Sequence, residues 1–184
     1  KGSAKPTEIY DINGSLLFYD FAVRLGTNEV GTIRAAATKE VGTPVVSLLI
    51  GPKLWDESRG REKIKAIVTK KYPRSRIVRE LLVCYSYPKI GLLVELTSRE
   101  GQPETLVFDI SDYSLIPTLP TEPREGAFAW SYLDKMDDRK RKANLRKYDQ
   151  QTQKVTQVVR ESDLSAIKRL VFERVVDVSK IKFR

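Results

Sequence analysis

The stretch from Ile9 to Leu25 reads IYDINGSLLFYDFAVRL and decides how the first half of the chain folds. Its Asn13-Gly14 pair separates a short apolar pair from a long apolar run, and Asn-Gly is a strong hairpin signal because both residues tolerate positive φ. After the turn every odd position is apolar or aromatic, whereas the even side becomes polar at Asp20 and Arg24. This alternation predicts a strand whose odd face packs in the core.

Similar apolar runs, separated by turn residues, continue along the chain. Further strands are expected at 30–37, 45–50, 77–87, 90–96 and 105–110. Between them, the residues from Trp55 to Tyr72 have apolar positions three and four apart, which predicts a helix that ends before Pro73. We therefore predict an α+β fold: an antiparallel sheet of about seven strands with one packed helix, plus a helical C-terminal extension.

Three prolines between residues 117 and 123 interrupt any regular element. They suggest an antiparallel α+β domain over residues 1–116, a proline-rich connector over 117–126 and a basic helical extension over 127–184. Within the extension, residues 127–159 have helical composition. A second helix is predicted after Ser162, because the apolar residues that follow recur at helical spacing: Leu164, Ile167, Leu170, Val171 and Val175.

The chain has no histidine and only one cysteine among its 184 residues. Catalytic triads, Cys-His pairs and imidazole acid/base chemistry are therefore excluded, and one thiolate cannot complete a zinc site. No phosphate-binding glycine loop occurs, and we expect no metal or other cofactor. The composition favours a non-enzymatic binding module.

The compartment stays open at this stage. A single cysteine excludes an internal disulfide, which suits a reducing compartment or a secreted protein without bridges. No apolar run reaches the ~18 residues of a membrane span, so none is expected. The first residues, KGSAKP, do not resemble a signal peptide. Localisation is therefore left unknown: the protein is cytoplasmic, or extracytoplasmic if a signal peptide was removed.

The net charge of +9 is concentrated towards the C-terminus, where residues 121–184 carry 16 basic and 10 acidic side chains. Such asymmetry suggests an anionic partner. Phosphates would be bound by the basic stretch and bases would stack on nearby aromatic rings. A solvated helix surface is the alternative interpretation. The candidate residues for partner or anion binding are Arg139, Lys140, Arg141, Lys142, Arg146, Lys147, Tyr148 and Trp130, with Tyr132 as a further ring.

Two other residue types bear on catalysis. Cys84 lies within an apolar strand with no base to activate it, so we predict a buried, inert thiol. Five carboxylates lie on or beside strands, and a pair of them would be needed for glycosidase-type chemistry. Nothing in their spacing requires such a pair: Asp11, Asp20, Glu95, Asp109 and Asp112.

The hairpin and strand pattern of IYDINGSLLFYDF at 9–21, VGTI at 30–33 and GTPVV at 42–46 resembles PepSY-like and streptopain-propeptide-like modules, which precede papain-like peptidases. The resemblance covers residues 9 to about 112. It implies a non-catalytic role as a pro-segment, folding chaperone or peptidase inhibitor. The chain departs from the pattern in having a basic helical tail and no peptidase domain, so no functional residue is transferred.

Two functions follow as expectations. The first is a non-enzymatic protein-interaction module with a protein partner, of pro-domain, chaperone or inhibitor type. The second is a nucleic-acid-binding protein that uses residues 139–147, whose affinity would fall steeply with salt. Oligomeric state is left open.

Overall fold

A computed structural model describes residues 5–25, 27–51, 53, 55–117 and 128–161 of the chain. The connector residues 118–126 and the second helix predicted after Ser162 lie outside the described residues. The first half contains β1 (Thr7–Asp11), β2 (Leu16–Leu25), β3 (Asn28–Ala36), a short 3-10 helix η1 (Lys39–Val41), β4 (Val45–Ile50) and α1 (Glu57–Lys71). The second half contains β5 (Ser75–Cys84), β6 (Ile90–Ser98), β7 (Pro103–Asp109), β8 (Leu115–Ile116) and α2 (Asp138–Glu161).

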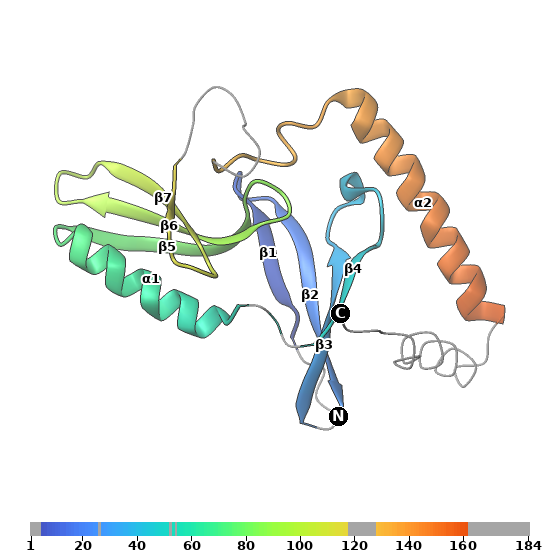
Figure 1. Cartoon of the computed structure of the whole chain (residues 1–184). Helices are drawn as coiled ribbons and strands as arrows, with labels where there is room; N and C mark the ends of the chain where they lie inside the picture. The colour runs from blue at the N-terminus through green and yellow to red at the C-terminus, as the bar shows by residue number, and fades with distance from the viewer. Residues whose placement is uncertain (1–4, 26, 52, 54, 118–127, 162–184) are drawn as a thin grey trace, which may run out of the picture.

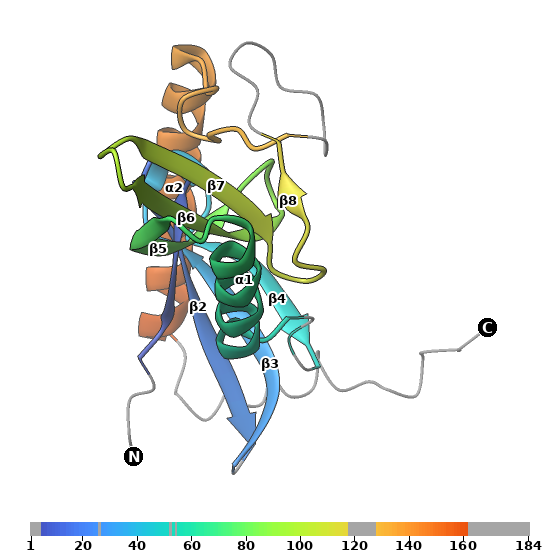
Figure 2. The same cartoon turned by 90° about the vertical axis from the view of Figure 1, so that its left-hand side faces the viewer.

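The eight strands form one sheet in the order β4-β3-β2-β1-β5-β6-β7-β8. Figure 1 labels β1 to β7, and Figure 2 labels β8. The predicted α+β class is confirmed, but the sheet is mixed and not purely antiparallel. All neighbouring strands are antiparallel except β1 and β5, which pair in parallel through Tyr10 with Val83 and Asp11 with Cys84. This pairing requires the helical crossover of α1 between the two halves of the sheet. The eighth strand, β8, was not predicted.

The half of the sheet formed by β5, β6 and β7 carries α1 on one face (Figure 2). The helix begins after Asp56, whose carboxylate accepts a hydrogen bond from the Arg59 N–H at 3.0 Å. Ile64 and Val68 of α1 are buried in the main core against these strands. The predicted helix over 55–72 is therefore confirmed, and its apolar stripe covers one face of this half.

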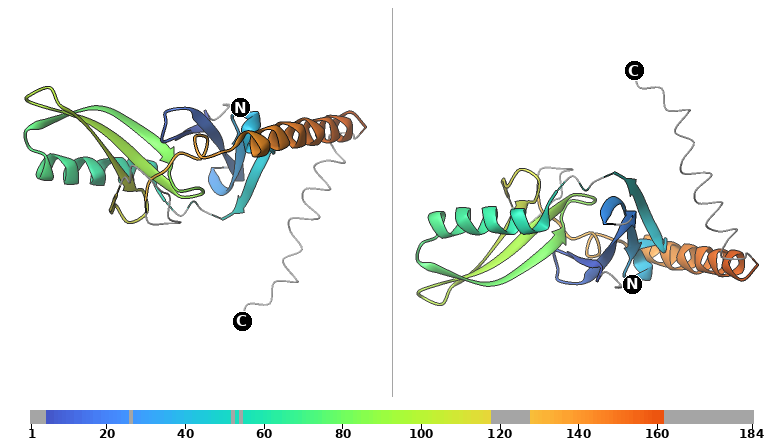
Figure 3. Two further views of the ribbon diagram at one scale, coloured as in Figure 1. Left: turned by 90° about the horizontal axis from the view of Figure 1, so that it is seen from above. Right: turned by 90° about the horizontal axis from the view of Figure 1, so that it is seen from below.

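The other face of the same half is covered in part by the segment that precedes α2. Ala129 of this segment packs with Leu93 and Val107, and Ile116 of β8 packs against the same cluster. The helix predicted over 127–159 in fact begins only at Asp138, because residues 128–137 are turns and extended chain. Figure 3 shows α1 and α2 at opposite ends of the sheet.

A buried carboxylate holds this covering segment on the sheet. Asp11, at the end of β1, is fully buried and accepts hydrogen bonds from the Ser131 hydroxyl at 2.8 Å and from the Leu133 N–H at 2.8 Å. A third bond comes from the Tyr132 N–H at 3.1 Å. Burial raises the pKa of Asp11, and these hydrogen bonds oppose the rise. Since the three donors belong to one turn, Asp11 sets where the chain crosses the sheet before α2.

The expectation that the odd face of β2 packs in the core is wrong for most of the strand. Leu17 is fully buried, but Phe21 is 41 % exposed and Leu25 lies in solvent near the hairpin tip. The even face is the covered one, since Phe18 and Asp20 are both buried. Alternation identifies a strand with two different faces, but only tertiary contacts decide which face is covered.

Candidate interaction surface

Three adjacent strands, β2, β3 and β4, present one sheet face that has no charged residue. The strand register places their side chains in three rows, each running straight across the strands. We call these nine positions the open face: Tyr19, Ala35 and Val45; Phe21, Ile33 and Leu48; Val23, Gly31 and Ile50. A sheet face that merely contacts water normally carries polar side chains, so an uncharged, apolar face of this kind is unusual for a solvent-exposed surface.

The open face is exposed to solvent in the part of the chain that the structure describes. Val45 is 53 %, Leu48 is 51 % and Ile50 is 66 % exposed, and no described element covers them. The rings of Tyr19 and Phe21 lie 6.3 Å apart between centroids, so the two aromatic residues form one contiguous patch. Helix α2 contacts η1 rather than the open face, and it runs away from the strands beyond that contact (Figure 1).

The open face reaches the edge of the sheet at β4. This strand, VVSLLI, pairs only with β3, so its outer backbone groups have no strand partner within the described part of the chain. It contains no charge and no proline, the usual devices that prevent an edge strand from pairing with another chain. The other edge, β8, is only two residues long. β4 is therefore the edge suited to accept a further strand.

The opposite face of the same three strands is polar and partly covered. Arg34 donates two hydrogen bonds to the buried Asp20 carboxylate, at 2.7 Å from Nε and 2.9 Å from Nη2. Burial and this ion pair act in opposite directions on the pKa of Arg34, and the net effect raises it. Trp55, from the connection between β4 and α1, packs against the core on this side. In this half of the sheet the face that carries charge is the covered one, and the uncharged face is open.

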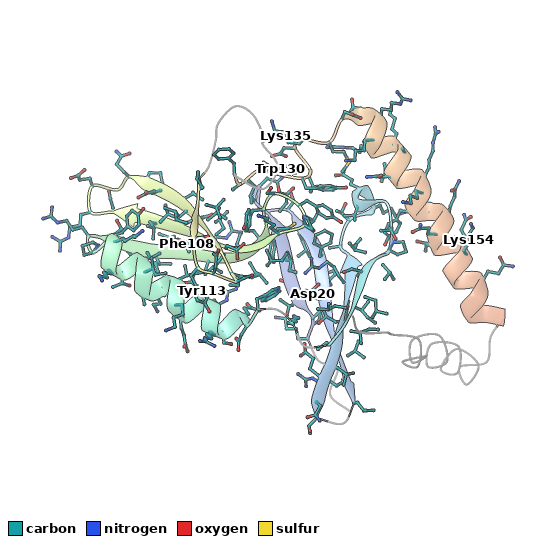
Figure 4. The ribbon with its side chains drawn as sticks, viewed as in Figure 1. Asp20, Phe108, Tyr113, Trp130, Lys135 and Lys154 are labelled. Atoms are coloured by element: carbon teal, nitrogen blue, oxygen red, sulfur yellow. The ribbon has the colours of Figure 1, made fainter. Side chains whose placement is uncertain are left out.

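The predicted basic stretch lies on α2 and separates into two sides. Arg139, Lys140, Lys142, Arg146 and Lys147 are exposed on the side of α2 that faces away from η1. No carboxylate interrupts this set between residues 139 and 147. These five residues form the basic face of α2, and Figure 4 labels Lys154 further along the same helix.

Arg141 belongs to the packed side of α2. Its Nη2 donates to the Leu133 carbonyl at 3.2 Å, and its Nη1 lies 3.6 Å from a carboxylate oxygen of Glu40. Asn144, one turn later, donates to the Glu40 carbonyl at 2.6 Å. Arg141 and Asn144 therefore attach α2 to η1, and the Arg141 guanidinium is engaged in these contacts although its side chain is still 39 % exposed.

The aromatic candidates are not grouped on the basic face. Tyr148 is half-buried, and the Lys39 ammonium lies 6.0 Å from its ring centroid. The Lys140 ammonium lies 5.5 Å from the ring centroid of Tyr132. Trp130 is half-buried in the segment before α2 (Figure 4), and its indole nitrogen is buried without a hydrogen-bond partner among the described residues. The structure thus pairs one exposed cation, Lys140, with Tyr132, but it does not gather Trp130, Tyr132 and Tyr148 on the basic face as a stacking platform.

Cys84 is buried at the end of β5, as predicted. Burial raises the pKa of its thiol to about 12, against a smaller lowering effect from Arg34. A thiol with this pKa is almost wholly protonated at neutral pH and does not act as a nucleophile.

The five candidate carboxylates have separate partners. Asp11 binds the 131–133 turn, Asp20 binds Arg34 and Glu95 lies 3.4 Å from Arg79. Asp109 accepts a hydrogen bond from the Tyr85 hydroxyl, and Asp112 accepts one from the Ser114 N–H at 2.8 Å. No two of them share a hydrogen bond. Among the described residues, no cluster of potential ligands is suited to a metal ion.

Comparisons with protein-family models, with curated proteins and with solved structures give no match to this chain. Within the described residues, neither helix combines the length and apolar character needed to cross a lipid bilayer. The two surfaces that could hold a partner are the open face with its β4 edge and the basic face of α2.

Proposed function

We propose that this protein is a non-enzymatic protein-interaction module that binds its partner through the open face and the β4 edge. The observation that carries the proposal is the uncharged, exposed row Phe21–Ile33–Leu48 together with Ile50 and Val45. Each half-exposed side chain gains roughly 1 kcal/mol when a partner removes its remaining apolar surface from water. Several of them together are sufficient for a specific interface.

The occupant is an extended segment of an acidic partner protein that adds a strand to β4. The unpaired outer edge of β4 supplies backbone hydrogen bonds, and the apolar side chains of the open face supply contacts for alternate residues of the added strand. A second copy of this chain is a poorer occupant, because two molecules of net charge +9 repel each other. An acidic partner would be attracted by the same charge.

A pro-segment, folding-chaperone or inhibitor role, as implied by the resemblance to PepSY-like modules, is part of this proposal. All three roles require a surface that holds another polypeptide in an extended conformation. The uncharged edge strand supports that requirement, because backbone pairing accepts many sequences.

The test is selection from a library of ten-residue peptides on the full chain, followed by affinity measurement on variants. We expect peptides with alternating apolar residues and acidic flanks. Leu48→Asp should weaken their binding at least tenfold, because it places a charge in the middle of the open face. Val78→Asp is the matched control, since Val78 is also a strand residue, 61 % exposed, but lies on β5.

Three results would overturn the proposal. They are a selection that yields no peptide, binding that Leu48→Asp leaves unchanged, and binding that Val78→Asp weakens as much. Sedimentation of the wild type completes the design. Self-association at micromolar concentration that Leu48→Asp abolishes would instead assign the open face to a second copy.

A second candidate function is nucleic-acid binding by the basic face of α2, which is favoured by its five exposed cations without an intervening carboxylate. If all five contact phosphates of a duplex, the affinity should fall roughly 500-fold between 50 and 200 mM salt. Lys142→Glu with Arg146→Glu should abolish the binding. Charge reversal of Arg141 is less informative, because its contacts with Leu133 and Glu40 hold α2 in place.

A further inference from the structure

A second site lies on the opposite side of β2, β3 and β4 from the open face. It is a hollow of about 240 Å³ beside Asp20, which Figure 4 labels on β2. The Asp20–Arg34 ion pair lines it, together with Lys53 and Trp55, two described residues that follow β4. We call it the Thr32 pocket, and the lining residues that matter here are Asp20, Thr32, Arg34, Leu49, Lys53 and Trp55.

Thr32 supplies a polar group that has no partner. The residue is only 5 % exposed, and its hydroxyl is buried without a hydrogen bond to any described residue. A buried hydroxyl without a partner costs free energy, so native proteins rarely retain one without a reason. Because Thr32 lines the pocket, a bound oxygen atom would satisfy the hydroxyl once a small side-chain shift opens it to the pocket.

Lys53 supplies a positive charge that is only weakly compensated. Its ammonium lies 4.0 Å from an Asp20 oxygen, which is too long for a hydrogen bond, and 4.8 Å from the centroid of the Trp55 ring. The Asp20 carboxylate is already occupied by the two hydrogen bonds from Arg34. Two cations against one carboxylate leave the pocket with one net positive charge.

We propose that the Thr32 pocket binds the carboxylate of a small apolar acid. The two carboxylate oxygens accept hydrogen bonds from the Thr32 hydroxyl and the Lys53 ammonium, and one negative charge matches the excess of the pocket. Leu49 and Trp55 provide apolar wall for the remainder of the ligand. A pocket of this size has the volume of roughly eight waters, which limits the ligand to a short chain.

The carboxylate belongs either to a free acid or to the C-terminus of a polypeptide, and both present the same chemistry. The probes are isovalerate, its neutral isostere isovaleramide, and a tripeptide ending in leucine as the free acid or the amide. Binding is followed on the full chain at pH 7 through the NMR amide signals of Thr32 and Leu49. We expect millimolar binding of isovalerate and at least tenfold weaker binding of isovaleramide.

Two variants test the assigned contacts. Thr32→Val keeps the shape but removes the hydroxyl, and Lys53→Met removes the charge. Each variant should weaken the binding of isovalerate at least tenfold. Lys63→Met, on the exposed surface of α1, should leave this affinity unchanged. Tighter binding of the tripeptide acid than of isovalerate would assign the pocket to a polypeptide C-terminus, and the reverse would assign it to a free acid.

The thermal unfolding of Thr32→Val separates ligand binding from a structural role. An unpartnered hydroxyl predicts an unchanged or raised Tm for this variant. The proposal is overturned by a lowered Tm with isovalerate affinity intact, by equal binding of isovaleramide, or by the absence of any shift at 10 mM isovalerate. None of these outcomes depends on the peptide selection at the open face, so the two proposals fail separately.

Discussion

The two halves of the sheet use the same kind of strand but end in opposite environments. In the β5–β8 half, the row Leu81–Leu93–Val107–Ile116 is covered by the segment around Ala129. In the β2–β4 half, the row Phe21–Ile33–Leu48 has no cover among the described residues.

The two rows belong to one continuous face, because β1 connects the halves. Glu8 pairs with Tyr19 in the open half, and Tyr10 pairs with Val83 in the covered half. Apolar residues on one face of a strand therefore predict that this face is buried. They do not say which element covers it, and that element can belong to the same chain or to a partner. The chain supplies it for one half, and we infer that a partner supplies it for the other.

The largest expected difference in stability is between two single variants that make the same leucine-to-alanine change, one in each half of the sheet. Leu93→Ala should lower the free energy of unfolding by about 2–5 kcal/mol, since it removes a buried side chain from the closed core. Leu48→Ala should cost less than about 1 kcal/mol, because the side chain is already half in water. Urea unfolding with unchanged m-values measures both. Equal losses would show that the open face is covered in solution.

The covering segment itself is tested at Asp11. Asp11→Ala leaves the Ser131 hydroxyl and the Leu133 N–H without their acceptor, so we expect a loss of about 2–3 kcal/mol and greater binding of an apolar dye. Asp134→Ala is the control from the same segment, because the Asp134 carboxylate is exposed and accepts one hydrogen bond within the described part of the chain, from the Asn13 amide at 2.9 Å. Similar losses in the two variants would contradict the anchoring role of Asp11.

The reactivity of the Cys84 thiol measures how often the β5–β8 half of the sheet opens, and the measurement needs no substitution at Cys84. With a pKa of about 12 and full burial, its thiol should react with iodoacetamide at pH 8 only when the core opens. Leu93→Ala should accelerate the reaction at least tenfold, and Leu48→Ala less than about fivefold, in line with its smaller loss of stability. Rapid labelling of the native wild type would show that this half is not closed.

The smallest effect concerns pH. Burial raises the pKa of Asp11 above the ordinary 3.8, so the folded chain holds this proton to a higher pH than the unfolded chain. The contribution of Asp11 to the free energy of unfolding therefore falls as the pH rises from about 3.8 through the raised pKa, and it is constant above that. The free energy of unfolding is measured against pH for the wild type and for Asp11→Asn. The difference between the two curves should isolate this decline. A rise with pH would mean that the hydrogen bonds outweigh burial.

Much of the fold could be predicted, because strands and helix α1 are local patterns. The Asn13-Gly14 turn, the alternation of β2 and the stripe of α1 depend on neighbours in the chain. The parallel β1–β5 pairing could not be predicted in this way, since it joins residues more than seventy positions apart. For the same reason the sequence did not show that Phe21 is exposed while Asp20 is buried.

The candidate sites were predicted less well. The basic stretch was visible in the sequence, but the inward turn of Arg141 depends on the carbonyl of Leu133 and on Glu40. The open face and the Thr32 pocket were missed. VVSLLI at 45–50 was a usable signal, because an uncharged strand that follows a hairpin is a candidate edge. Nothing in the sequence marks the buried hydroxyl of Thr32.

The most direct test of the central claim compares the two edges of the sheet by amide hydrogen exchange, on the full chain with and without a selected peptide. If a partner strand adds to the open half, amides of β4 should exchange at least tenfold more slowly in the complex, while those of β8 stay unchanged. Protection of β8 instead, or no change at β4 under saturating peptide, would contradict the assignment of the open face and the β4 edge as the partner surface.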